Sequence, residues 1–151
     1  PLYEQLEMLK RHCAAVFAAI GSGVAASAFS VFCLVKLLGL SHEDYVTLLP
    51  KSITTAIGMG VSEEAGGIVA LTVVTIILTG VAGSVMAELI FKMVKIHHPV
   101  ARGLALGTSA HAVGTSKALE LGEIEGAMSS LAIAVAGLLT VILVPIISGL
   151  A

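Results

Sequence analysis

The segment AGGIVALTVVTIILTGVAGSVMA, at positions 65–87, contains no charged side chain. An α-helix rises about 1.5 Å per residue, so a helix of this length spans about 34 Å. That length crosses a hydrocarbon core of roughly 30 Å with some tilt. Two further uncharged runs of similar or greater length lie at 13–35 and at 126–151. Each of the three runs is predicted to form a transmembrane helix.

The composition of the whole chain agrees with a membrane location. Apolar residues make up 57% of the 151 residues and charged residues 12%, with a mean hydropathy of +1.04. Soluble domains have about 25% charged residues. A water-soluble helical core would need a polar outer face on each helix, and these runs have none. A cleaved signal peptide is also excluded for the run at 13–35, because its apolar region would be shorter and further spans follow. We therefore expect an all-α integral membrane protein.

Several other functional classes lack support in the sequence. The net charge is −2 and there is no basic run, so nucleic-acid binding is not indicated. Cys13 and Cys33 lie at opposite ends of one predicted helix, too far apart to bond to each other. There is no metal-ligand spacing and no phosphate loop, and the Gly58-x-Gly60 and Gly103-x-x-x-Gly107 patterns have no dinucleotide context. We predict no enzyme, no catalytic residue, no metal and no cofactor.

The chain is expected to form one membrane domain, residues 1–151, in which regular spans alternate with less regular segments. The predicted transmembrane helices are 13–38, 66–95 and 125–151. The less regular segments are 41–65, which is amphipathic and then broken, and 99–122, which is broken. Both are too polar and glycine-rich for a lipid-facing helix, yet too apolar for a solvated loop. Residues 1–12 are expected to lie on the membrane surface, and Ser41 is the expected N-cap ahead of Glu43 and Asp44.

The two broken segments resemble each other when they are aligned with Thr54 on Thr108. This alignment also places Ala56, Gly60 and Ser62 on Ala110, Gly114 and Ser116, and Thr55 on Ser109. Four identities in nine positions is a weak match between stretches rich in small residues. Each copy is nevertheless followed by a long span. We interpret the unit as a broken polar helix plus a spanning helix, used twice.

Broken helices at membrane depth indicate a functional site. Irregular backbone is tolerated there only where protein encloses it or where it lines a watery cavity. Paired interrupted segments in two repeats point to the midplane binding site of a transporter. If both segments are re-entrant hairpins, the span between them makes them enter from opposite faces, and their tips could meet. If both cross the membrane, they run parallel. Charge bias favours Lys92, Lys95 and Arg102 on the cytoplasmic side and Glu63 and Glu64 on the other.

The hydroxyls and free backbone N–H groups of the broken segments suit a small anion, and a carboxylate is the natural ligand. The candidate substrate-binding residues are Thr54, Thr55, Thr108, Ser109, His111, Thr115 and Arg102. The alternative is that Ser and Thr hydroxyls satisfy backbone breaks or bond the preceding turn. Histidine is the side chain whose charge most readily changes near neutral pH, so His111 could bind the carboxylate or carry a proton. The alternative is a buried structural histidine bonded to a carbonyl.

Charged residues near the broken segments have two interpretations each. Glu63 and Glu64 are candidates, with His111, for proton coupling, but they could equally cap a helix or lie at the interface. For Lys51 we favour snorkelling to the interface over attraction of a substrate. For Arg102 we favour neither interpretation over the other. Interfacial positions are expected for Glu88, His97, His98, Glu123 and Glu125.

Four stretches carry a resemblance to a known family: PKSITT at 50–55, SEEAGG at 62–67, ARGLALGTSAHAVGT at 101–115 and EIEGAMS at 123–129. With them the chain resembles the LrgB/CidB family, which includes the YohK proteins and the C-terminal half of the plastidic glycolate/glycerate translocator. The resemblance covers essentially the whole chain, and it implies additional N-terminal spans in full-length members. In two departures, Ala56 replaces a usual proline and Gly58 a common alanine. Without the proline, Gly58 and Gly60 are expected to supply the break.

The resemblance implies a transporter of small monocarboxylates such as pyruvate, glycolate, glycerate or lactate. It also implies a small LrgA/CidA-like membrane partner, a homo- or hetero-oligomer, and a multi-pass location in the bacterial inner membrane, or in the chloroplast inner envelope of a plant. Antiholin-like or holin-associated control of murein hydrolase export and cell lysis is the alternative function. A purely structural subunit is disfavoured, because unsatisfied backbone groups in hydrocarbon cost several kcal/mol each.

Overall fold

The computed structural model describes the backbone of residues 6–150 and the side chains from Cys13 to Leu150. All regular elements in this part of the chain are helical, which confirms the all-α prediction. They are α1 (Leu6–Leu38), α2 (His42–Leu48), α3 (Thr55–Glu64), α4 (Val69–Met93), α5 (Pro99–Leu121), α6 (Glu123–Ile147) and a final 3-10 turn, η1 (Ser148–Leu150). The surface position expected for residues 1–12 concerns side chains outside the described residues.

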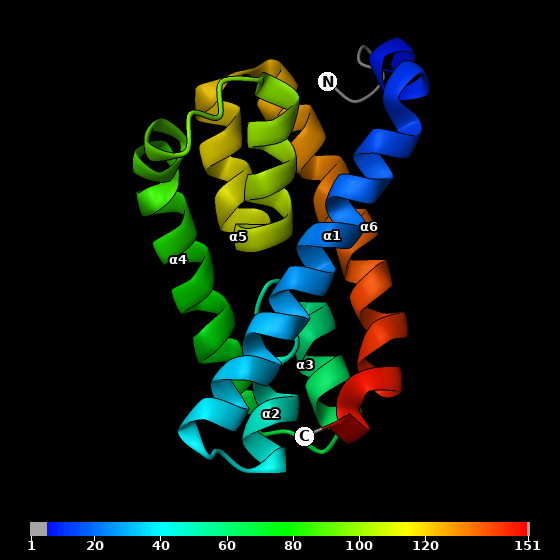
Figure 1. Ribbon diagram of the computed structural model, residues 1–151, viewed down its shortest axis with the longest axis vertical. Helices are drawn as coiled ribbons and strands as arrows, with labels where there is room; N and C mark the ends of the chain where they lie inside the picture. Colours follow the sequence, from blue (N-terminus) through cyan, green and yellow to red (C-terminus); the bar gives the residue numbers. More distant parts are fainter. Residues whose placement is uncertain (1–5, 151) are drawn as a thin grey trace.

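Three helices are long and apolar enough to cross a membrane, over Cys13–Leu38, Val69–Met93 and Glu123–Leu150. They belong to α1, α4 and α6, which run along the long axis of the molecule (Figure 1). Their outer surfaces are apolar, and Leu37, Val85 and Ile146 are among the most exposed side chains. So large an apolar surface is suited to lipid and not to water. The prediction of three membrane spans is confirmed.

The first broken segment is a re-entrant hairpin. Both α2 and α3 lie in the half of the molecule where α1 ends, and the chain between them, residues 49–54, reaches toward the middle (Figure 1). Pro50 lies at this break, where a missing N–H and a fixed φ interrupt a helix. The expected break at Gly58 and Gly60 is wrong, because both residues lie inside α3. Gly58 instead permits close packing, since a Cβ there would overlap the Cδ1 atom of Ile76 on α4.

The second broken segment, α5, is also a re-entrant hairpin. Its two helical parts join at His111, where φ is 42° and ψ is −133°, far from helical values. A Cβ on Gly114 would lie 2.5 Å from the carbonyl oxygen of Leu106, whereas residues eight apart in a straight helix are separated by about 12 Å. The two halves therefore lie side by side, and they enter from the end opposite to α2 and α3 (Figure 1). The sequence left open whether the two broken segments re-enter or cross the membrane, and the structure has both as re-entrant hairpins.

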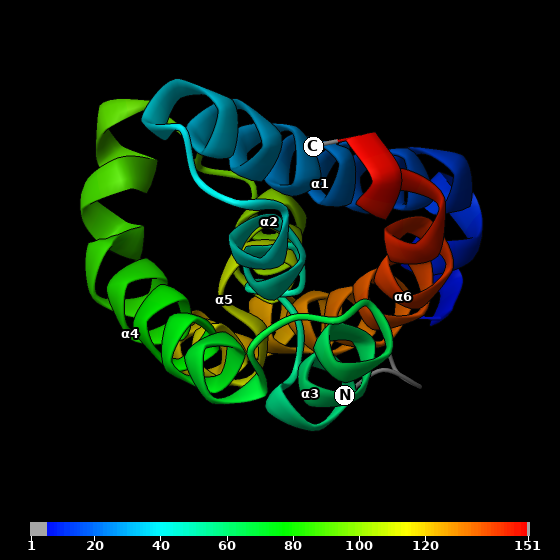
Figure 2. The same ribbon diagram turned by 90° about the horizontal axis from the view of Figure 1, so that it is seen from below.

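The helix bounds follow the same alignment as the broken segments. With Thr54 on Thr108, the bounds of α4, Val69 and Met93, fall on Glu123 and Ile147, which are the bounds of α6. The two helices run in opposite directions, so the units α2–α3–α4 and α5–α6 are inverted relative to each other along the long axis of the molecule (Figure 1). Seen from below, α2 and α5 lie in the centre and α1, α4 and α6 surround them (Figure 2). This is the arrangement of inverted repeats in transporters, with a site expected where the broken helices meet.

The hairpin α5 packs against α6 with very little separation between the two backbones. A Cβ on Gly103 would overlap the carbonyl oxygen of Glu125, and one on Gly107 would overlap that of Ser129. Small residues at this spacing allow helices in a membrane to approach closely. The Gly103-x-x-x-Gly107 pattern is therefore a helix-packing motif.

The entrance to the first hairpin is capped as the sequence predicts. The Ser41 hydroxyl accepts a hydrogen bond from the backbone N–H of Asp44 at 3.1 Å, and the Asp44 carboxylate accepts from the Ser41 N–H at 3.0 Å. The Ser41 hydroxyl also donates to this carboxylate at 2.7 Å. The hydrogen bonds from the Ser41 side chain and then its backbone hold the pKa of Asp44 below the ordinary value. These reciprocal hydrogen bonds form a capping box. The box stabilises α2 fully at pH values above the usual carboxyl pKa of about 3.9, and the stabilisation is lost as the pH falls through the lowered pKa of Asp44.

Candidate functional site

A cleft with a volume of about 1440 Å³ lies between α1, α4 and the first half of α5. Its walls are built mainly from small side chains, because alanine, glycine, serine and threonine recur on all three helices. Those on α1 are Ala15, Ala19, Ser22, Gly23, Ala26, Ser27 and Ser30; those on α4 and α5 include Thr79, Ala82, Gly83, Ala101, Ala105, Thr108 and Ser109. The small side chains of α1 thus face a space large enough for a ligand.

The described part of the cleft lining has basic side chains and no acidic ones. Among the side chains from Cys13 to Leu150, its lining contains Lys51 and His98 and no aspartate or glutamate. His98 is the residue before α5, so it lies near one end of the molecule. Lys51 belongs to the tip of the first hairpin, at the inner end of the cleft. An apolar cleft with a cation at its inner end favours an anion over a cation as ligand.

Lys51 is held in place by two serine hydroxyls. Its ammonium donates to Ser27 Oγ at 3.0 Å and to Ser52 Oγ at 3.1 Å, and the two hydroxyls lie 3.0 Å from each other. Ser27 lies close to the middle of the apolar span Cys13–Leu38. The interpretation of Lys51 as a snorkelling residue is therefore wrong, because the ammonium bonds to groups at mid-depth of the span.

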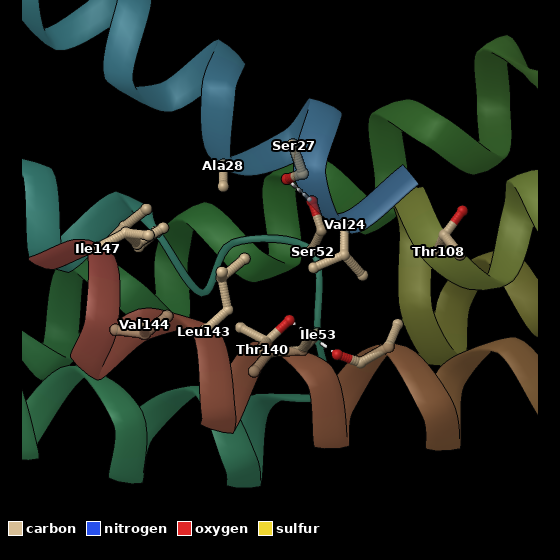
Figure 3. Close-up of a pocket in the computed structure, with 12 residues that line it drawn as sticks. Val24, Ser27, Ala28, Ser52, Ile53, Thr108, Thr140, Leu143, Val144 and Ile147 are labelled. Carbon is tan, nitrogen blue, oxygen red and sulfur yellow. Dashed lines mark hydrogen bonds between the residues drawn. The ribbon is translucent and has the colours of Figure 1, made fainter. Parts of the chain in front are cut away.

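The two hairpin tips meet at a second, much smaller cavity of about 10 Å³, which lies beside the cleft. The cavity is lined by Ser52 and Ile53 of the first hairpin and Thr108 of the second, together with Thr140 of α6 (Figure 3). Thr108 also lines the cleft, so it belongs to both spaces. A Cβ on Gly23 would lie 3.1 Å from Thr108 Oγ1, which shows how closely α1 approaches this tip.

Two of the predicted site residues reach the cleft. Thr108 is 8% exposed, and its hydroxyl donates to the carbonyl of Leu104 at 2.8 Å. Ser109 is exposed, and its hydroxyl donates to the carbonyl of Ala105 at 2.6 Å. Both hydroxyl hydrogens bond the preceding turn, as the alternative interpretation proposed, while their oxygens remain acceptors. Thr54 and Thr55 are half-buried at the start of α3, outside the lining of both spaces.

His111 fastens the second hairpin tip to α4. Its side chain is 4% exposed, and Nε2 lies 2.8 Å from the carbonyl oxygen of Ile76. The ring fits because residue 80 is glycine, since a Cβ there would lie 2.5 Å from the ring. Thr115 strengthens the tip, because its hydroxyl donates to the carbonyl of His111 at 3.1 Å and lies 2.7 Å from Ser129 Oγ. This geometry favours a structural histidine, outside the cleft lining.

The other predicted charged residues lie toward the ends of the molecule. Arg102 donates from Nε to the carbonyl of Ile96 at 2.9 Å and covers the ring of Phe91 at 5.7 Å, which fits a role in packing. Glu63 and Glu64 are exposed at the end of α3. The structure therefore brings none of these three to the cleft.

Two of the residues expected at the interface have different surroundings. Glu125 is 7% exposed, because the α5–α6 packing covers it; it lies in the first turn of α6, and its interfacial depth stays a prediction. His98 lines the cleft. The site residues that the sequence interpretation missed are Ser27, Ser52 and Thr140, and the signal that could have found Ser52 is the Pro50-Lys51-Ser52 break.

The family described as LrgB-like matches residues 1–150 of the chain. Similar curated proteins include "Antiholin-like protein LrgB" of Bacillus cereus (strain B4264) and the protein of the same name from Bacillus anthracis (strain A0248). Each is 39% identical over 145 residues, which is 96% of this chain and 63% of the relative. The chain thus spans less than two thirds of the length of these relatives. No solved structure matches it.

Proposed function

Since the chain belongs to the LrgB-like family, we propose that it is a membrane protein that transports small monocarboxylates such as pyruvate, glycolate, glycerate or lactate. The observation that carries the proposal is the meeting of two re-entrant hairpin tips at the inner end of a cleft that contains Lys51. Discontinuous helices that meet at mid-membrane are the usual binding element of secondary transporters. A helix that only anchored the chain would gain nothing from such breaks.

The polar groups near the hairpin tips support a small anion as the transported species. Lys51 supplies the positive charge, and Ser27, Ser52, Thr108 and Ser109 supply hydroxyls around the inner end of the cleft. Proton coupling through His111, Glu63 or Glu64 stays a prediction; His111 bonds to the carbonyl of Ile76, and both glutamates are exposed. We also propose that the protein lies in a bacterial inner membrane and works with a small LrgA/CidA-like partner.

A second candidate function is antiholin-like regulation of membrane permeability and murein hydrolase release. The name of the relatives, antiholin-like protein LrgB, favours this regulatory function more directly than it favours transport. Assembly with a small holin-like partner would use the apolar outer faces of the spans. Under this function the lysis phenotype would persist in variants that no longer transport.

Uptake of labelled pyruvate and glycolate tests the first function, with the full-length protein reconstituted in liposomes with and without its small partner. We expect saturable uptake and a KM raised about 30-fold in Thr108→Val with Ser109→Ala. Each hydroxyl can turn from its own helix carbonyl to donate to the substrate, and its loss weakens binding by roughly 1 kcal/mol, about 2 kcal/mol for the pair. Thr75→Val is the matched control, since Thr75 also bonds its own helix, to the carbonyl of Thr72, but lies outside both spaces. No uptake above empty liposomes, with a lysis effect retained in cells, would favour the antiholin-like function instead.

A further inference from the structure

We propose that the ammonium of Lys51, together with the hydroxyls of Ser27 and Ser52, binds the carboxylate group of the ligand and selects monocarboxylates. This inference rests on the transport function proposed above and names the group that recognises the substrate. It is carried by the donor geometry of the three side chains, by the unpaired charge of Lys51, and by the composition of the surrounding cleft.

The three side chains leave two hydrogen-bond donors free. A lysine ammonium has three N–H donors, and Lys51 directs two of them to Ser27 Oγ and Ser52 Oγ. The serines have two O–H donors between them, and one is used in their mutual hydrogen bond. One N–H and one O–H therefore remain beside each other at the inner end of the cleft. Two adjacent donors, one of them charged, match the two oxygens of a single carboxylate.

The charge of Lys51 has no counterpart within the described side chains. There, the ion pairs are those of Lys117, with Glu88 at 2.7 Å and with Glu120 at 3.2 Å. A charge at membrane depth is costly and is normally paired or placed at a functional site. Ser27 fixes this ammonium near the middle of a span, and the lining residues that the structure describes include no acidic side chain. A bound anion would supply the missing partner.

The remaining lining explains why one carboxylate is preferred to two. Around Lys51 the cleft is built from Gly23, Ala26 and Thr108, which offer space and no second positive charge. Among the described lining residues, the other titratable one is His98, which immediately precedes α5 and therefore lies about 15 Å from Thr108 along the helix. A short dicarboxylate would place its second charge where these residues offer no second cation, at a high desolvation cost.

Competition binding separates charge recognition from packing. Purified full-length protein binds labelled pyruvate, and lactate, the uncharged lactamide and the dicarboxylate succinate compete with it. In the wild type we expect lactamide and succinate to compete at least about 10-fold more weakly than lactate, because a charge-assisted hydrogen bond is lost or a charge is left unpaired. In Lys51→Gln we expect pyruvate and lactate to bind about 10-fold or more weakly, so that lactate loses its advantage over lactamide. Lys51→Arg should keep part of this advantage.

Lys92→Gln is the matched control, because Lys92 is exposed at the end of α4 and outside the cleft; it should leave all affinities unchanged. Ser52→Ala should weaken pyruvate binding several-fold and keeps the test valid if Lys51→Gln does not fold. Undiminished binding of pyruvate by these variants, or equal competition by lactate and lactamide in the wild type, would overturn the site. If the site is overturned in this way but uptake persists, the transport function stands without the site. If carboxylate binding depends on Lys51 but the protein shows no uptake, the site is upheld and transport is rejected.

Discussion

Valine in place of Gly107 is expected to remove most of the folded protein from the membrane fraction. A Cβ at this position would overlap the carbonyl oxygen of Ser129 and would lie 2.7 Å from the Cβ of Ala132. Neither atom can rotate away, because one is backbone and the other is fixed to it. The α5 hairpin must therefore move off α6, and we expect a cost of about 3 kcal/mol or more, at the upper end of the range for overpacked cores.

Fluorescence-detected gel filtration of the tagged full-length protein, followed by thermal melting, measures this loss. Gly21→Val is the matched control, because Gly21 also lies within a helix, α1, and a Cβ there would meet nothing within 4 Å. It should remain monodisperse, with a melting temperature close to that of the wild type. Equal yields and melting temperatures for the two variants would show that α5 and α6 are not in close contact.

Gly80→Val is expected to reduce transport about 10- to 100-fold while the protein still inserts into the membrane, because the second hairpin tip loses its attachment to α4. A Cβ at residue 80 would lie 2.5 Å from Cε1 and 2.6 Å from Nε2 of the His111 ring, so the ring must leave the carbonyl of Ile76. The lost hydrogen bond and the overpacking each cost roughly 1–3 kcal/mol. Thr108, on the same hairpin, moves with the tip.

A double variant isolates this contact. His111→Ala alone should also reduce uptake, but added to Gly80→Val it makes room for the new side chain, so the two effects should be clearly less than additive. Gly60→Val is the control, since a Cβ at that position of α3 meets nothing within 4 Å. Strictly additive losses, or full uptake by Gly80→Val, would show that His111 does not dock against Gly80.

The membrane spans and the repeat were predictable because both depend on local sequence. The length of an uncharged run determines whether a helix can cross the bilayer. The repeat was visible in the residues around Thr54 and Thr108, and the same alignment relates the bounds of α4 and α6. The position of Thr108 and Ser109 at a meeting point followed from the same repeat.

Other features depend on how helices pack and rotate, which a single sequence does not encode. The turn of α5 occurs at His111, a non-glycine residue with positive φ, held there by its bond to α4. Thr54 and Thr55 lie at the start of α3, but outside the cleft lining. Lys51 has the sequence context of an interfacial lysine, and only the approach of Ser27 from α1 reveals its depth.

The structure of the full-length protein with bound lactate, determined by electron cryo-microscopy, tests the carboxylate site most directly. We expect density for the carboxylate within hydrogen-bond distance of Lys51 Nζ, between the tips of the two hairpins and beside Thr108. Carboxylate density remote from both tips, or a carboxylate side chain of the protein paired with Lys51 in place of the ligand, would contradict it.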